Sequence, residues 1–143
     1  MKNLTIKTET SISKKRLEIL KSDAKHHMEI LRLSELDITI KQSSDMNNNN
    51  GLAYFSGKRS KKIEIKNTRD FNELRGTLAH EACHINQFVT GKLICEGKKS
   101  TYYGEDLSKL AYDRQPWEIH ANDYALAFKI IKNIKTYVGT KIR

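Results

Sequence analysis

Apolar residues recur at helical spacing in two segments of the chain, and a proline indicates the start of a third helix. Across residues 17–31 they stand three and four positions apart, which predicts a helix with one apolar stripe on an otherwise charged surface. The same spacing across residues 71–89 predicts a second helix, and Pro116 suits the first turn of a third. The last helical segment is apolar on more than one side, which suits either the core or a contact with a partner, and we favour the core for Phe128, Ile130, Ile131 and Ile134.

Residues suited to helix ends flank these segments. Side chains of Ser, Thr and Asp accept hydrogen bonds from the free amides of a first turn, and glycine readily adopts the left-handed conformation just beyond a last turn. The candidates are Ser11 or Ser13 for the first helix, Thr68 or Asp70 with Gly91 for the second, and Gln115 for the third.

Shorter stretches alternate apolar and polar residues, as half-buried strands do. The alternation is weak in residues 4–7 and clear in residues 36–41. Residues 52–55 and 61–66 flank the segment SGKRS and predict a hairpin, whereas the asparagine-rich residues 43–51 predict a loop. The whole pattern predicts an α+β fold in a single domain of residues 1–143, with an N-terminal helix, a small sheet of three to four mainly antiparallel strands, and two later helices.

Composition and charge indicate the compartment in which the protein works more clearly than its function. A chain of 143 residues, 38% of them hydrophobic, is long enough for one hydrophobic core. Its 26 Lys and Arg against 17 Asp and Glu give a net charge of +9, which suits nucleic acid or simply a lysine-rich surface, and no nucleic-acid-binding motif accompanies it. No run of 18 apolar residues occurs, so we expect no membrane insertion and a cytoplasmic protein. Two cysteines without CxxC spacing fit a reducing compartment.

The second predicted helix contains the HExxH motif His80-Glu81-Ala82-Cys83-His84. A spacing of four residues brings the two imidazoles onto one helix face, one turn apart, where they can share a metal ion. In zinc peptidases the glutamate of this motif is the general base. Because the histidines lie almost opposite the apolar stripe centred on Leu78, we expect this helix to be covered on both sides.

A third metal ligand must come from elsewhere in the chain, because catalytic zinc sites have three protein ligands and one open position. We favour Glu118, which Gln115 and Pro116 place in the first turn of a helix, although a glutamate there can also serve as a helix cap. Glu105 is the main alternative, in a loop-like stretch. The full set of candidates is Glu96, Glu105, Asp106, Asp113, Glu118, His120 and Asp123.

The segments TLAHEACHINQF and PWEIHANDYALAF resemble the gluzincin branch of zinc metallopeptidases, most closely the ImmA/IrrE-like and minigluzincin proteins. The resemblance covers roughly residues 70 to 130 and implies a zincin-like fold. It implies Zn²⁺ bound by His80, His84 and Glu118, and hydrolysis of a protein or peptide substrate by a zinc-bound water with Glu81 as general base. The metzincins are excluded because Thr90 stands where their third histidine would be.

Several further residues are candidates for supporting roles. A residue near the motifs should stabilise the oxyanion, and the candidates are Tyr102, Tyr103, Tyr112 and His120. Asn122, one turn beyond Glu118, could hydrogen-bond to it. The hairpin edge could hold an extended peptide by strand addition.

Other residues of the same regions have structural interpretations. We expect Cys83 to be a buried, inert thiol, Trp117 a packing anchor, and His26 and His27 surface residues. The alternative function is a non-catalytic or regulatory zinc-binding protein on the same scaffold, associated with nucleic acid.

Overall fold

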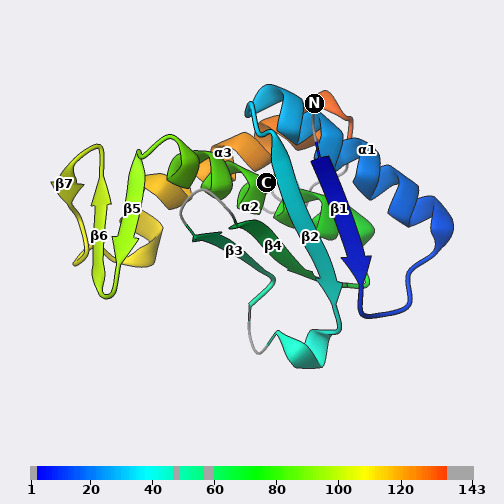
Figure 1. Cartoon of the computed structure of the whole chain (residues 1–143). Coiled ribbons are helices and arrows are strands. Elements are labelled where there is room, and N and C mark those ends of the chain that lie inside the picture. The colour runs from blue at the N-terminus through cyan, green and yellow to red at the C-terminus, as the bar shows by residue number, and fades with distance from the viewer. Residues whose placement is uncertain (1–2, 47–48, 57–59, 135–143) are drawn as a thin grey trace, which may run out of the picture.

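In the computed structural model, three α-helices and two β-sheets make up the described part of the chain, residues 3–46, 49–56 and 60–134 (Figure 1). The α+β class is confirmed. Among the described residues, no helix combines the length and apolarity that crossing a membrane requires. In chain order the elements are β1 (Asn3–Thr8), α1 (Lys14–Ile30), β2 (Glu35–Lys41), the 3-10 helix η1 (Ser43–Asp45), β3 (Gly51–Ser56), β4 (Ser60–Lys66), α2 (Phe71–Val89), β5 (Leu93–Glu96), β6 (Lys99–Tyr102), β7 (Glu105–Asp106), the 3-10 helix η2 (Tyr112–Arg114) and α3 (Pro116–Ile131).

The larger sheet has the strand order β1-β2-β4-β3 and is mixed. The predicted hairpin is present, since β3 and β4 pair antiparallel, with its turn at residues 57–59 outside the described residues. The other two pairings differ from the mainly antiparallel arrangement that the pattern predicts, because β1–β2 and β2–β4 are parallel. The reason lies in the connections: α1 joins β1 to β2, and η1 with β3 separates β2 from β4, so each strand can return in the same direction.

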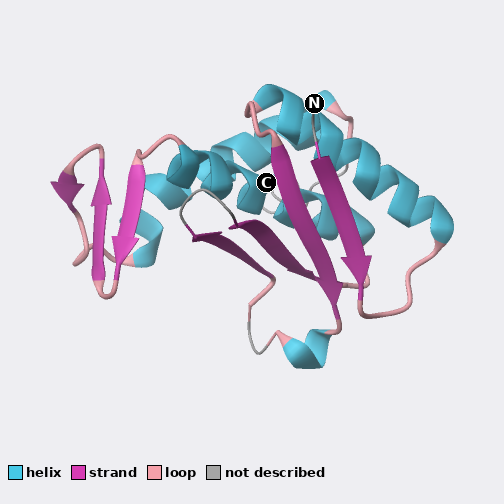
Figure 2. Ribbon diagram, in the orientation of Figure 1, coloured by secondary structure: helices cyan, strands magenta, loops and turns pink. Residues whose placement is uncertain are grey.

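One face of this sheet forms the main core. Rows of residues in register cross the strands, as in Ile6, Ile38, Ile63 and Ala53, and helices α1 and α2 cover them (Figure 2). The buried residues of the core are Leu20, Ala24, Met28, Leu33, Leu36, Ile38, Ile40, Ile63, Ile65, Leu74, Leu78, Ala82 and Ile85.

Helix α2 is covered on both sides, as expected from its sequence. Leu78 packs into the main core, whereas Ala79 belongs to a smaller buried cluster with Ala125 and Phe128 of α3. The side chain of Asp70 caps the helix by accepting hydrogen bonds from the first-turn amides. Gly91, with φ of +76°, ends it in the left-handed conformation. Both helix ends therefore follow the sequence prediction.

Two expectations about burial are wrong. His27 is fully buried beside the apolar stripe of α1, because its ring packs against Tyr124 and Phe128 of α3 and its Nδ1 lies 2.7 Å from the Tyr124 hydroxyl. Ile130 and Ile131 are 67% and 70% exposed and do not belong to the core. Helix α3 packs through Ala121, Ala125 and Phe128, which lie on another face.

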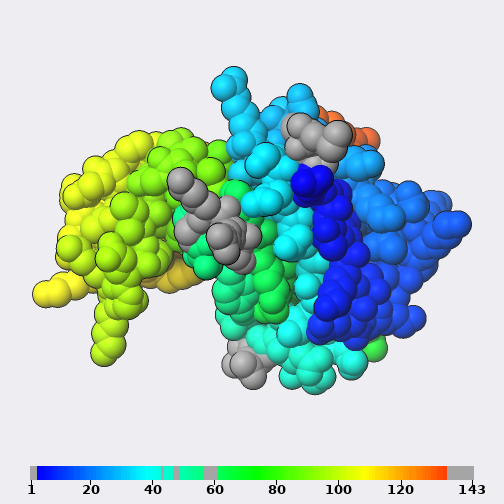
Figure 3. All heavy atoms as spheres, viewed as in Figure 1, coloured from blue at the N-terminus to red at the C-terminus, as the bar shows by residue number. Residues whose placement is uncertain are grey.

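The second sheet, β5-β6-β7, is antiparallel throughout. Its residues form a lobe at one end of the molecule (Figure 3, yellow-green). The positive φ angles of Gly97 and Gly104 permit the tight turns between its strands. The lobe packs against the beginning of α3, where the rings of Tyr102 and Trp117 are 5.8 Å apart. It thereby forms one wall beside the candidate site.

Candidate metal centre

Three side chains from two helices converge on one point. His80 and His84 project from the same face of α2, and their Nε2 atoms are 3.1 Å apart. The carboxylate of Glu118, in the first turn of α3, lies 3.0 Å from Nε2 of His80 and 3.1 Å from Nε2 of His84. All three ligand atoms lie within 4.8 Å of one another. This His-His-Glu group could hold a metal ion.

The close approach of α3 to α2 brings Glu118 to the histidines. Ala121 and Ala125, the small residues on the contact face of α3, are buried. Gln115 occupies the N-cap position, but its side chain makes no capping bond. The Glu118 carboxylate contacts His80, His84 and Tyr112. The contacts of Glu118 are therefore those of the predicted ligand, whereas its rival Glu105 is exposed on β7.

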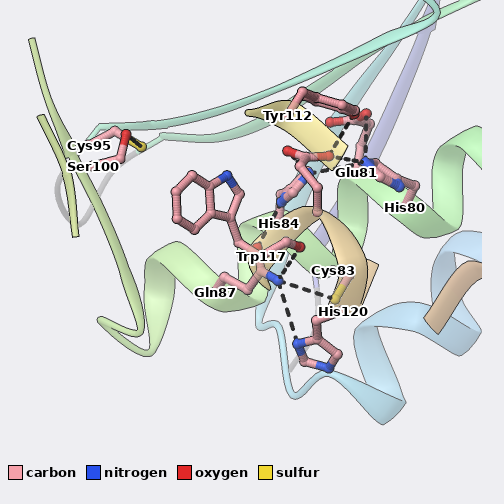
Figure 4. A network of polar contacts seen from close by, with 11 residues as sticks. His80, Glu81, Cys83, His84, Gln87, Cys95, Ser100, Tyr112, Trp117 and His120 are labelled. Atoms are coloured by element: carbon pink, nitrogen blue, oxygen red, sulfur yellow. Dashed lines mark hydrogen bonds and ion pairs between the residues drawn. The ribbon is translucent and has the colours of Figure 1, made fainter. Parts of the chain in front are cut away.

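Gln87 fixes the orientation of His84. Its amide nitrogen donates a 3.0 Å hydrogen bond to the carbonyl oxygen of Trp117, which can only accept, so its amide oxygen faces Nδ1 of His84, 2.7 Å away. Nδ1 of His84 therefore carries the hydrogen on the side that faces Gln87 (Figure 4). Nε2 of the neutral ring is then an acceptor, 3.1 Å from the Glu118 carboxylate.

The electrostatics of the group favour a cation. Burial opposes ionisation of Glu118, but its close contacts with His80 and His84 and the hydrogen bond from Tyr112 outweigh burial and hold the pKa of this carboxyl well below its usual range. Burial lowers the pKa of His84, yet its contact with Glu118 produces a net rise. A carboxylate facing imidazole acceptor atoms requires a positive charge between them, either a proton or a metal ion.

Glu81 lies next to this group and is nearly buried. It is 8% exposed, and its Oε2 is 4.0 Å from Nε2 of His80. Burial raises its pKa. Strand β3 passes close to it, since a Cβ atom at Gly51 would lie 2.8 Å from Cγ of Glu81 and 2.7 Å from Cγ2 of Thr77. Gly51 therefore allows the strand to approach the carboxylate.

Open space borders the group on two sides. One cavity of about 570 Å³ and another of about 280 Å³ share Gly51, His80, Glu81 and Tyr112 in their walls. Glu118 lines the smaller one. The His-His-Glu group, which we call the metal-binding group for its proposed role, and the Glu81 carboxylate thus lie in a cleft that an external molecule can enter.

Of the residues predicted to have supporting roles, Tyr112 and Asn122 line the cleft, whereas His120 and Tyr103 are exposed. The Tyr112 hydroxyl donates a 2.7 Å hydrogen bond to Glu118, and burial together with this bond raises the pKa of Tyr112. Asn122 lines the larger cavity. His120 is exposed, with Nδ1 3.5 Å from the amide nitrogen of Gln87. Tyr103 is 67% exposed on the small sheet, with its ring against Tyr102.

The expectations for Cys83 and Trp117 agree with the structure. Cys83 is buried, which raises its pKa to about 12, and Trp117 is only 5% exposed.

Two residues that contribute to the site, Gln87 and Gly51, are not among those predicted from the sequence. The position of Gln87, three residues after His84 on the same helix, is a signal that could have identified it.

Comparison of the chain with protein-family models, curated proteins and solved structures finds no match in any of the three. Its function is therefore inferred from the site itself.

Proposed function

We propose that the protein is a zinc-dependent metallopeptidase of the gluzincin type. One observation carries the proposal: His80, His84 and Glu118 gather three ligand atoms within 4.8 Å, and the Glu81 carboxylate lies 4.0 Å from the first of them in an open cleft. A structural zinc site usually has four protein ligands, commonly including cysteine, and needs no adjacent carboxylate.

The ligand set suits zinc in type and spacing. Zinc binds imidazole nitrogen and carboxylate oxygen at about 2.0–2.2 Å, so two ligand atoms of a tetrahedral site stand roughly 3.3–3.5 Å apart. The two Nε2 atoms here are 3.1 Å apart, one carboxylate oxygen of Glu118 lies 3.0 Å from His80, and the other lies 3.1 Å from His84. With one ligand atom from each residue, the three atoms lie within 4.8 Å of one another. Three protein ligands leave the fourth position to water or substrate, as in catalytic zinc sites.

The proposed reaction is hydrolysis of a peptide bond. Bound zinc supplies Lewis-acid activation of the attacking water and of the scissile carbonyl. Glu81 accepts one proton from the water while the water oxygen bonds to the carbonyl carbon. The carbon–nitrogen bond then breaks, and Glu81 delivers that proton to the leaving amine. One water is consumed, and a carboxyl and an amino terminus are produced.

Tyr112 is the residue we propose for stabilising the oxyanion. Of the four tyrosine and histidine candidates, it is the one that lines both cavities together with His80 and Glu81. Its hydroxyl donates its one hydrogen to Glu118, 2.7 Å away, and turns that hydrogen to the carbonyl oxygen when negative charge develops there.

Hydrolysis of quenched fluorescent peptides by zinc-loaded protein tests the proposal. Glu81→Gln should lower kcat/KM by about 100-fold or more, which is the usual contribution of a general base, whereas Glu105→Gln on β7 should leave it unchanged. Zinc binding without any Glu81-dependent hydrolysis would overturn the peptidase proposal in favour of a regulatory zinc-binding protein.

We place the activity in the cytoplasm. Both cysteines are free and one of them, Cys95, is exposed, which suits a reducing compartment.

A further inference from the structure

The two halves of the cleft differ in chemistry. The smaller cavity, about 280 Å³, has apolar walls formed by four different elements: Leu52 and Ala53 of β3, Phe88 of α2, Leu93 of β5 and Trp117 of α3. Asn49 and Cys95 complete these walls beside the residues of the metal-binding group. We call this space the apolar half of the cleft.

The apolar half has firmly held walls. Leu93 is 3% and Trp117 5% exposed, so only a small part of each side chain faces the cavity and the rest is held in place by packing. The ring of Phe88 stacks on that of Phe55, with centroids 6.1 Å apart. Trp117 lies beside His84, with its indole directed toward the strands that carry Cys95 and Ser100 (Figure 4). A preformed apolar space therefore adjoins the metal-binding group.

The larger cavity, which we call the polar half, is lined by more polar and charged residues than apolar ones, with Ala125 and Leu126 as the apolar members. Glu73, Asp123 and Lys129 line it, together with Asn50, Thr77 and Asn122. The Lys129 side chain lies over Gly76, in the space that a Cβ atom there would occupy. An apolar side chain entering this half would take water away from charged groups without replacing its hydrogen bonds, which disfavours it.

The direction of β3 relates these halves to the direction of a bound peptide. β3 is an edge strand of its sheet, so a peptide can pair with its free side. Gly51, the first residue of β3, lines both halves, and Asn50 just before it lines the polar half, whereas Leu52 and Ala53 line the apolar half. Antiparallel pairing is the more stable arrangement. It places the peptide residues before the scissile bond beside Leu52 and Ala53.

We propose that the protein cleaves peptides on the carboxyl side of an apolar residue, whose side chain occupies the apolar half, and that polar residues follow the cleaved bond. This inference rests on the proposed peptidase function. The expected preference for Leu over Asp at the position before the cleaved bond is about 10- to 100-fold in kcat/KM, the usual discrimination of an apolar pocket.

Two peptides of the same composition test the cleavage direction. One carries Leu before and Asp after the central bond, and the other carries the two residues exchanged. Mass spectrometry of the products from zinc-loaded wild type should show the first peptide cut after Leu at least about 10-fold faster than the second is cut at its centre. Cleavage of both at equal rates, or preferentially before Leu, would overturn the inference while leaving the peptidase function intact.

Binding gives a second readout that does not depend on turnover. Trp117 is the single tryptophan of the chain, so its fluorescence reports directly on the apolar half. Zinc-loaded Glu81→Gln should bind the Leu-before-Asp peptide with a Kd at least about 10-fold lower than that of a peptide with Asp at both positions. Equal Kd values would contradict the inference even if no peptide is hydrolysed.

Two variants, each with a leucine of one half of the cleft replaced by aspartate, test which half binds the apolar side chain. Leu52→Asp should abolish the preference for Leu, whereas Leu126→Asp, the same change in the polar half, should retain it. Retention of the preference in Leu52→Asp would argue against the apolar half as the binding site. If Leu52→Asp does not fold, the product analysis with wild type and the peptide-binding measurement with Glu81→Gln decide between the two outcomes. Absence of all Glu81-dependent cleavage, by contrast, would remove the peptidase function itself.

Discussion

The amide oxygen of Gln87 accepts a 2.7 Å hydrogen bond from Nδ1 of His84, and Gln87 is completely buried. The same amide donates to the carbonyl oxygen of Trp117, the residue before Glu118. One side chain thus connects His84 on α2 with the backbone next to Glu118 on α3. It sets the tautomer of His84 and the separation of the two helices at the metal-binding group.

Gln87→Met should weaken zinc binding about 10- to 100-fold, because methionine fills the space without accepting from His84 or donating to Trp117. Competition with a chelator measures the affinity. Gln42→Met, the same change at an exposed position, is the control. An unchanged affinity in Gln87→Met would show that packing alone orients His84.

Gly51→Ala should impair the reaction and spare the metal. The added Cβ atom would stand 2.8 Å from Cγ of Glu81 and must displace that side chain. Misplacing the base by about 1 Å costs on the order of 100-fold in kcat/KM, while His80, His84 and Glu118 stay in place. Peptide hydrolysis and zinc content measured on one preparation check both parts. Ser56→Ala, at the other end of β3, should behave as wild type, and full activity of Gly51→Ala would refute the proposed role of the close approach.

Asp23→Ala should destabilise the fold by about 3 kcal/mol. Asp23 is 2% exposed and pairs with Arg75 through two hydrogen bonds of 2.7 and 2.9 Å, which tie α1 to α2, and its loss leaves a guanidinium without its partner in a partly buried site. Glu18→Ala, which breaks an exposed 3.9 Å pair with Lys21, should cost less than about 0.5 kcal/mol. Urea unfolding measures both, and equal losses would contradict the importance of the buried pair.

His27 should make the fold sensitive to acid. Burial, followed by the charges of neighbouring cationic groups, lowers its pKa from 6.5 to about 3. The unfolded chain binds a proton at His27 below pH 6.5 whereas the folded chain does not, so stability falls as the pH drops from 6.5 toward 3. At pH 4.5 this contribution is about 2–3 kcal/mol.

His27→Phe should therefore lose less stability than wild type between pH 7 and pH 4.5. The measurement is urea unfolding of metal-free protein at both pH values. His120→Phe makes the same change at an exposed histidine and should keep the wild-type pH dependence. An unchanged dependence in His27→Phe would mean that other groups cause the sensitivity to acid.

The site was predictable where it depends on local spacing. The positions of His80 and His84 follow from helix geometry, as do the Asp70 cap and the Gly91 termination of α2. Glu118 required one additional inference, that Pro116 begins a rigid helix, and the structure brings its carboxylate to the histidines.

The remaining features depend on contacts between distant segments. The burial of His27 and the exposure of Ile130 follow from which face of α3 packs against α1 and α2, which the composition of one helix does not specify. Parallel pairing of β1, β2 and β4 depends on the route of the connections rather than on alternation within a strand. The strands of the small sheet, only two to four residues long, are too short for a periodic pattern.

The most direct test of the central claim is the metal content of untagged protein, measured by elemental mass spectrometry after zinc reconstitution. We expect about one zinc per chain in wild type, in Glu81→Gln and in the control Glu105→Ala, and a clear loss in Glu118→Ala, because only the last variant removes one of the three ligands. Absence of zinc in wild type, or full zinc content in Glu118→Ala, would contradict a catalytic site built from His80, His84 and Glu118.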